Sequence, residues 1–380
     1  MPSHLPYIAV SAFDILALAA VIGALATGLW IIPEGARESF HRRLWRLTGF
    51  GLVALTVSSL VLLVGRTLEM SRQSLHHVFH WLPLVVRETS FGHIWMIRPV
   101  MLLGAWAAWL IGRRPARHRA AYAILLCTAV IAFTRSATGH PADQGQWTAP
   151  EWMDFVHLMA ASVWAGGLFA MSVAIFPFLS QARLSTPVRL ALVQRLSSVA
   201  AIALAAILVT GVLSAYHYLG GFGPLFSTAY GHILLVKLAL VAIAIALGAA
   251  NRFVFVPRIR AAQSASRPLT APAHDTDEHA FFRLARSVAV ETGFLGAALV
   301  AAAVLLHGMP PSDMAHTMAG GAVAQAHQPR ARFELTRFKE SSGPCLAPAI
   351  STIRYGVLRR SASQMSSPGT LKPRFHHLSL

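Results

Sequence analysis

The 380-residue sequence has little charge and almost no cysteine. Charged side chains make up 12% of the chain, whereas they make up about a quarter of an ordinary soluble domain. This shortage excludes a typical soluble globular protein. Two cysteines are too few for a scaffold held by several disulfides. Acidic residues are also scarce, with 15 Asp and Glu against 32 Lys and Arg, and the formal net charge is +17.

Long apolar runs are what the sequence contains instead, and hydrophobic residues make up 55% of it. A helix needs roughly 20 apolar residues to cross about 30 Å of hydrocarbon. Eight stretches meet this requirement, the fourth only if Arg135 snorkels to the far interface. We therefore predict an all-α integral membrane protein in the lipid bilayer, a bundle of eight transmembrane helices near Ile8–Ile32, Leu47–Val64, Ile94–Ile111, Ala120–Thr138, Phe155–Phe178, Leu196–Leu219, Ile233–Val254 and Val288–His307.

Lys and Arg are distributed unevenly among the connections between these stretches. The odd-numbered connections contain 17 of them, whereas the N-terminus and the even-numbered connections contain four. Cytoplasmic loops of membrane proteins carry an excess of Lys and Arg. We therefore expect eight spans with both termini outside. Most of the positive charge is explained by this topology, and no nucleic-acid partner is expected.

Three regions are expected along the chain. Residues 1–149 form an N-terminal membrane half of four helices, and residues 150–312 form a second membrane domain of four helices. Within the second, Asn251 to Arg286 contains Pro257 and a mixed-charge run, and is predicted to be a cytoplasmic loop. Residues 313–380 are rich in Ser, Pro and Arg, and are predicted to be a disordered basic tail.

Histidine is abundant, with 18 residues, and the predicted topology places most of them on one side of the membrane. Imidazole binds Cu(I) and Cu(II), and the thioether of Met prefers Cu(I). Only His41, His118, His274 and His279 are expected inside. The histidines expected on or near the outer face are His76, His77, His80, His93, His140, His157, His217, His232, His307 and His316.

Two of these histidines, His157 and His217, are the strongest ligand candidates, because each falls within an apolar helix where a polar side chain needs a partner. Met153 lies four residues before His157 and shares its helix face. Thr210, Ser214 and His217 form a polar stripe on the sixth stretch. For any single histidine the alternative is a hydrogen-bonding role at the level of the lipid headgroups, and the methionines could simply fill space.

Four charged residues fall inside the predicted spans, namely Asp14, Arg98, Lys237 and Glu291. A charge at the bilayer centre costs about 2.5–3.5 kcal/mol on insertion scales, so each is expected to face the bundle and to be paired or hydrated. Asp14 and Lys237 both fall in the outer half, and we predict an ion pair between them. The sequence leaves open whether this pair only fixes helix packing or belongs to a pathway.

The second half resembles the copper resistance D (CopD) family of bacterial inner-membrane proteins, over roughly residues 150–312. The resemblance depends on a His157-x6-Trp164-x-Gly166-Gly167 helix followed by Thr210-Gly211. It continues in a Tyr230-Gly-His232-x4-Lys237 helix, in Asn251-Arg252, in Glu291 and in Pro310-Pro311. The first 150 residues resemble the family chiefly in Gly139-His140. His232 stands where the family commonly has Arg.

The resemblance implies copper handling at the inner membrane, usually uptake from the periplasm, often alongside a small periplasmic copper carrier, CopC. Such a carrier is expected to be a separate chain. We therefore predict a copper permease or copper-transfer protein, with no catalytic residues. Its copper site is built from His157 and His217 with help from His140, Met153 or His232. Trp164 and Glu291 are expected to accompany this site. No ATP-binding Gly-x-x-x-x-Gly-Lys motif is present.

Two alternatives remain open at this point. Paired histidines on adjacent helices also hold haem, so the chain could be a b-type electron carrier with a single haem. It could also be an accessory protein that hands copper to a partner without transporting it. The oxidation state of the copper is not specified by the sequence.

Overall fold

The computed structural model describes residues 5–71, 75–113, 118–138, 147–179, 184–219, 221–258, 273–308 and Pro311. Every regular element in these residues is a helix. Eight of the helices are long and apolar enough to cross a membrane. The predicted fold class and number of spans are confirmed, whereas the outside location of both termini and the boundary between the two membrane domains stay predictions. The predicted tail, 313–380, lies outside the described residues.

The first half contains four long helices and five short helical elements at their ends. A π-helical turn and a 3-10 turn follow α1, and a 3-10 turn and two short helices precede α5. The second predicted span is longer than expected, because its helix continues through charged residues at both ends. The elements are α1 (Leu5–Ala26), η2 (Thr27–Ile31), η3 (Glu34–Ala36), α2 (Arg37–Ser71), η4 (Leu75–His77), α3 (Val78–Glu88), α4 (Ser90–Trp95), α5 (Ile97–Ile111) and α6 (His118–Ser136).

The second half begins with the same order of elements, a long helix, a π-helical turn, a 3-10 turn and a second long helix. The elements are α7 (Ala149–Ala170), η6 (Met171–Ile175), η7 (Phe176–Phe178), α8 (Thr186–Leu219), α9 (Gly223–Ser227), α10 (Ala229–Ala250), η8 (Asn251–Phe255) and α12 (Ala273–Leu305).

The loop predicted from Asn251 to Arg286 is wrong at both ends. Helical structure continues from Asn251 to Arg258, and α12 already begins at Ala273. The mixed-charge run that suggested a loop includes the first turns of α12. Charged residues are compatible with a helix that extends beyond the hydrocarbon into water, so hydropathy alone marks only the part of the helix that lies in lipid.

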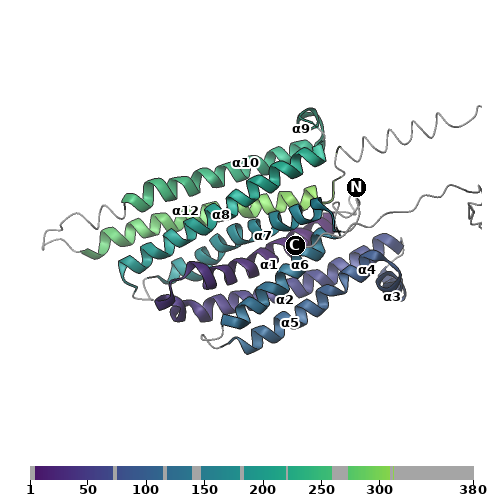
Figure 1. Cartoon of the computed structure of the whole chain (residues 1–380), viewed down its shortest axis with the longest axis horizontal. Helices are drawn as coiled ribbons and strands as arrows, with labels where there is room; N and C mark the ends of the chain where they lie inside the picture. The colour runs from purple at the N-terminus through teal and green to yellow at the C-terminus, as the bar shows by residue number, and fades with distance from the viewer. Residues whose placement is uncertain are drawn as a thin grey trace, which may run out of the picture. The chain divides into compact units, whose positions relative to one another are not determined.

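Helices α1 and α7 form the centre of the bundle, and Figure 1 shows α10 and α5 at its opposite edges. Of the 18 most apolar consecutive residues in the first span, 67% are buried, whereas in the span that contains α10 only 6% are buried. The two central helices cross at Gly23 and Gly166, where a Cβ atom on either glycine would clash with the backbone of the other helix. Small residues allow membrane helices to approach this closely. The crossing therefore depends on both glycines.

A repeated turn shows that the two halves are built alike. Thr89 accepts a hydrogen bond from the backbone N–H of Gly92 over 2.9 Å, and Thr228 accepts one from Gly231 over 3.0 Å. Both threonine hydroxyls also donate to the carbonyl four residues back, over 2.6 Å in each case. The next histidine in each half, His93 or His232, contacts the carbonyl six residues before it.

The repeat extends to the packing of the long helices. Helix α1 packs against α2 as α7 packs against α8, and α5 packs against α6 as α10 packs against α12. Contacts between the halves are also matched, because α1 touches α12 and α7 touches α6. With four spans in each half, both halves enter the membrane from the same side. Two such repeats are related by an axis along the membrane normal. Sequence analysis did not detect this repeat.

Candidate metal site

The first half contains a buried ionic network around Asp14 on α1, whose side chain is fully buried. Its carboxylate accepts hydrogen bonds from Arg98 on α5 at 2.9 and 3.2 Å, and from Arg135 on α6 at 2.7 Å. Ser58 on α2 donates to the same carboxylate over 2.7 Å. Arg135 also donates to the hydroxyl of Ser11 over 2.6 Å. Four helices are thus joined at one carboxylate.

This network corrects two predictions. Asp14 pairs with Arg98 and Arg135, not with Lys237, because α5 and α6 belong to the same half as α1, whereas Lys237 lies on α10 at the far edge. Arg135 does not snorkel to the interface but lies 9% exposed beside Asp14. A carboxylate within reach compensates the buried guanidinium, so the fourth span needs no exposed end for this residue.

The second half has an imidazole in the matching position. His157 lies nine residues before Gly166, as Asp14 lies nine residues before Gly23. Nδ1 of His157 is 3.0 Å from the hydroxyl of Thr210 on α8. That hydroxyl also lies 2.7 Å from the carbonyl of Ala206, and with its single proton donated there it accepts from the Nδ1–H of His157. In this tautomer the lone pair is on Nε2, where it is available to a metal ion.

Asp154 and Lys237 complete the polar group around His157. Asp154, three residues before His157 on α7, accepts a hydrogen bond from Ser136 over 2.7 Å. Lys237 on α10 interacts electrostatically with both Asp154 and His157. All three side chains are half-buried. Lys237 is nine residues after Thr228, as Arg98 is nine residues after Thr89, so the repeat places a cation beside each site.

Helix α6 connects the two sites through consecutive residues. Arg135 binds Asp14 on α1, and the next residue, Ser136, binds Asp154 on α7. The ionic network of the first half and the imidazole group of the second are therefore parts of one polar belt across the bundle. We define the polar belt as Asp14, Ser58, Arg98, Arg135, Ser136, Asp154, His157, Thr210 and Lys237.

The structure places the other predicted ligands separately from His157. His217 is half-buried and contacts the Tyr218 ring. It lies seven residues after Thr210, which is roughly 10 Å along α8. His232 is exposed and its Nε2 contacts the carbonyl of Phe226 over 2.9 Å. Met153 is half-buried one turn before His157, and His140 lies outside the described residues.

Trp164 and Glu291 meet elsewhere in the second half. Trp164, two turns after His157 on α7, makes a hydrogen-bonding contact with Glu291. Asn251 donates to the Glu291 carboxylate over 3.2 Å, and Glu291 is 3% exposed. Glu291 was expected at the start of the last span but lies well inside α12. These family-motif residues therefore form a cluster of their own within the bundle.

Sequence analysis singled out His157 but missed its partners. Asp154, three residues before His157, and Ser136 were not among the predicted ligands. The signal for Thr210 was its place in a polar stripe, which also contains Ser214 and His217. Across the residues that the structure describes, no three His, Cys, Asp or Glu side chains are grouped closely enough to hold a metal ion. A metal at His157 would thus need Met153 or ligands from outside this set.

Comparison with known proteins gives two family matches along the chain. Residues 1–149 match the N-terminal domain of copper resistance protein D-like proteins, and residues 190–305 match copper resistance protein D. Among curated proteins, the inner membrane protein YebZ of Escherichia coli is 27% identical over 266 residues, covering 69% of this chain and 88% of YebZ.

Two other relatives are named for copper. Copper resistance protein D of Pseudomonas syringae pv. tomato is 29% identical, covering 62% of this chain and 78% of that protein. Copper transport protein CutJ of Bacillus subtilis is 30% identical, covering 57% of this chain but only 40% of CutJ. No solved structure matches the chain.

Proposed function

Because this chain belongs to the copper resistance protein D family and is a multi-pass inner-membrane protein with a copper-related function, we propose that it carries copper ions across the membrane with His157 as the central ligand. The observation that carries this proposal is the hydrogen bond between His157 and Thr210. A metal-binding histidine normally donates its other ring N–H to a neighbouring acceptor, which orients the ring and fixes the tautomer. Thr210 supplies that acceptor from an adjacent helix.

The other predicted ligands fit a path with successive positions better than a single cluster. Met153 is one turn before His157 on α7, and its thioether suits Cu(I). His217, farther along α8, would receive the ion first and pass it to His157. His232 would assist, together with His140, which is predicted on the same side of the membrane. In this proposal uptake runs from the outer face inward, with a separate CopC-type protein as donor.

Lys237 gives the site a means of releasing its cargo. Its ammonium group and a bound copper ion carry the same sign and share the surroundings of Asp154 and His157. In a medium of low dielectric constant two like charges at such positions repel strongly. A copper ion would therefore stay only briefly at His157, which favours passage over storage. Asp154 offsets part of the positive charge during occupancy.

The proposal is tested with purified protein and with whole cells. We would measure bound copper and copper accumulation for the wild type, His157→Ala, Thr210→Val and Thr210→Ser. His80→Ala serves as the control, because His80 is an exposed imidazole on α3. We expect His157→Ala to lose most bound copper. Thr210→Val should weaken binding by about 10–100-fold, the usual cost of removing a partner that orients a metal ligand. Thr210→Ser should restore binding.

Two outcomes would contradict the proposal in different ways. Equal copper in the wild type and His157→Ala would show that His157 is not the ligand. Copper bound at His157 together with unchanged accumulation would assign the chain to copper delivery instead of transport. A Soret band in the purified protein would favour the haem alternative.

A further inference from the structure

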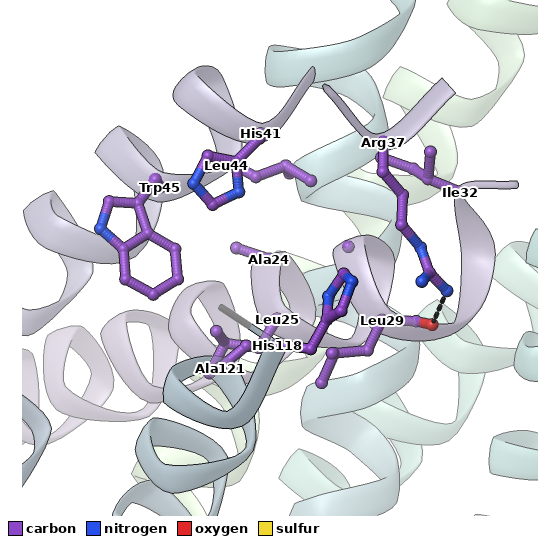
Figure 2. A pocket seen from close by; sticks show the side chains of 11 residues that line it. Ala24, Leu25, Leu29, Ile32, Arg37, His41, Leu44, Trp45, His118 and Ala121 are labelled. Atoms are coloured by element: carbon purple, nitrogen blue, oxygen red, sulfur yellow. Dashed lines mark hydrogen bonds between the residues drawn. The ribbon is translucent and has the colours of Figure 1, made fainter. Parts of the chain in front are cut away.

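A second polar site lies in the first half, on the far side of the Gly23–Gly166 crossing from Asp14. It is a cavity of about 50 Å³ between the end of α1 and the first turns of α2 and α6. By the same measure one water molecule needs about 10–15 Å³, so the cavity has room for a small polyatomic group. Its polar lining comes from Arg37, His41, Trp45 and His118, and Figure 2 shows these side chains around the space.

Two nitrogen atoms at this cavity lack a hydrogen-bond partner. The Nε of Arg37 and the Nε2 of His41 are both buried, and neither has a partner in the described part of the chain. Buried polar groups left unsatisfied cost about 1–3 kcal/mol each and are rare. A ligand with more than one acceptor atom could satisfy both of these atoms, which come from different residues at one cavity.

Both side chains are held in place by other contacts. The Nη2 of Arg37 donates to the carbonyl of Leu29 over 2.9 Å, shown as the dashed line in Figure 2. The ring of His41 stacks on Trp45 with centroids 5.3 Å apart. Arg37 also approaches Glu34 at 3.6 Å, but Glu34 is 87% exposed and therefore compensates little of the charge. The His41 ring also has hydrogen-bonding contacts with the backbone of Gly112 and Arg113. The guanidinium of Arg37 and the ring of His41 are thus held in position before a ligand arrives.

The charge around the cavity favours an anion over a metal cation. None of the described residues that line it is acidic, whereas Arg37 is a permanent cation and two imidazoles accompany it. Arg37 is the first residue of α2 and His118 the first residue of α6, so the positive ends of two helix dipoles also lie here. Copper would be repelled by Arg37, which separates this cavity from the site at His157.

We propose that this cavity binds a phosphate group, bonded by Arg37 and His41. Phosphate offers several acceptor oxygens to an arginine, and basic pockets between membrane helices bind the headgroups of anionic lipids. The same chemistry is available from a phospholipid headgroup or from free phosphate. His118 is exposed, so the cavity is reached from the surface of the bundle. Binding would hold the first turns of α2 and α6 to the end of α1.

The test uses the purified full-length protein and two probes. Native mass spectrometry counts retained phosphatidylglycerol in mixtures with phosphatidylcholine, and thermal unfolding is followed with added inorganic phosphate. The variants are Arg37→Gln, His41→Gln and Gly28→Leu, the last filling the cavity without changing charge. A Cβ atom on Gly28 makes only an ordinary 3.5 Å contact with Leu44, so this substitution does not disturb the backbone. Arg42→Gln is the matched control, because Arg42 is exposed and not part of the lining.

We expect each cavity variant to weaken binding at least about tenfold, as loss of a charge-assisted hydrogen bond would, and Arg42→Gln to change it little. Binding of phosphatidylglycerol alone would identify the lipid as the source, and binding of inorganic phosphate alone would identify the free ion. The proposal is overturned if neither probe binds, or if Arg42→Gln weakens binding as much as the cavity variants do. Should Arg37→Gln fail to fold, His41→Gln and Gly28→Leu still decide the outcome.

Discussion

In the first half of the bundle a carboxylate, Asp14, lies between two arginines and a serine, and every member of the group is buried. In the second half an imidazole, His157, lies at the matching place, with a threonine, an aspartate and a lysine around it. Both arginines of the first group bond the Asp14 carboxylate directly. In the second group His157, Asp154 and Lys237 are half-buried, and Nδ1 of His157 lies 3.0 Å from the hydroxyl of Thr210. The same framework thus supports a fixed ionic contact on one side and the proposed metal ligand on the other.

The cations show the difference most directly. Arg98 and Lys237 occupy equivalent positions after equivalent threonine caps. Arginine keeps its charge under all conditions and bonds Asp14 directly, whereas lysine is a compact, flexible point charge. The permanent charge of Arg98 suits a structural contact with Asp14. The flexible side chain of Lys237 suits the proposed release of copper from His157.

The largest effect that would test this contrast is expected for Asp14→Ala. This substitution leaves Arg98 and Arg135 buried without their anion, and removing one member of a buried ionic group costs about 3–5 kcal/mol. The free energy of unfolding should be measured in mixed micelles. Glu69→Gln is the control, because the Arg66–Glu69 pair is exposed and worth no more than about 1 kcal/mol. Equal costs for the two variants would mean that the Asp14 network is not structural.

A smaller loss, about 3 kcal/mol at the upper end of typical overpacking costs, is expected for Gly166→Ala. The added methyl group clashes with the backbone of α1, so the two halves must separate. Gly167→Ala is the matched control, because its nearest new contact is the side chain of Ile31 at 3.8 Å. Thermal unfolding of both variants measures the difference. If Gly167→Ala were the more harmful, the crossing would not join the halves as described.

The smallest effect compares the two caps with each other. Thr89→Ala and Thr228→Ala should each destabilise the protein by about 1 kcal/mol, the usual cost of losing an N-cap. Their hydrogen bonds are nearly identical, at 2.9 and 3.0 Å, so the two losses should agree closely. Neither cap contacts His157, so copper binding at His157 itself should change in neither variant. Clearly unequal losses of stability would show that the repeated turn contributes differently to the stability of each half.

The spans could be predicted from the sequence because hydropathy is a local property. Each apolar run reports its own environment, and the sequence therefore predicted eight helices, including the weak one that ends near Arg135. The partners of buried charges could not be predicted in this way, because they depend on the packing of helices that are distant in the sequence. Asp14 could be matched with Lys237 by depth alone, but its true partners are decided by which helices are neighbours.

The candidate site could be predicted only in part for the same reason. His157 was found because a polar residue inside an apolar helix is conspicuous. Its contact with Thr210 depends on how α7 packs on α8. The repeat was recorded in the sequence, because Thr89 to Arg98 and Thr228 to Lys237 are identical at four of ten positions, but a match of this length is too short to stand out. His41 and His118 fell on the side expected to be cytoplasmic and were not considered as part of a site.

The attachment of α6 to both halves has a mechanical consequence. Two adjacent side chains, Arg135 and Ser136, are tethered to different helices, so α6 can neither slide nor turn on its axis without straining at least one tether. A displacement of α7 would pull on Ser136 and reach α1 through the next peptide unit. Helices α1, α6 and α7 are thus coupled at this level of the bundle, and freeing α6 at either tether would remove this coupling.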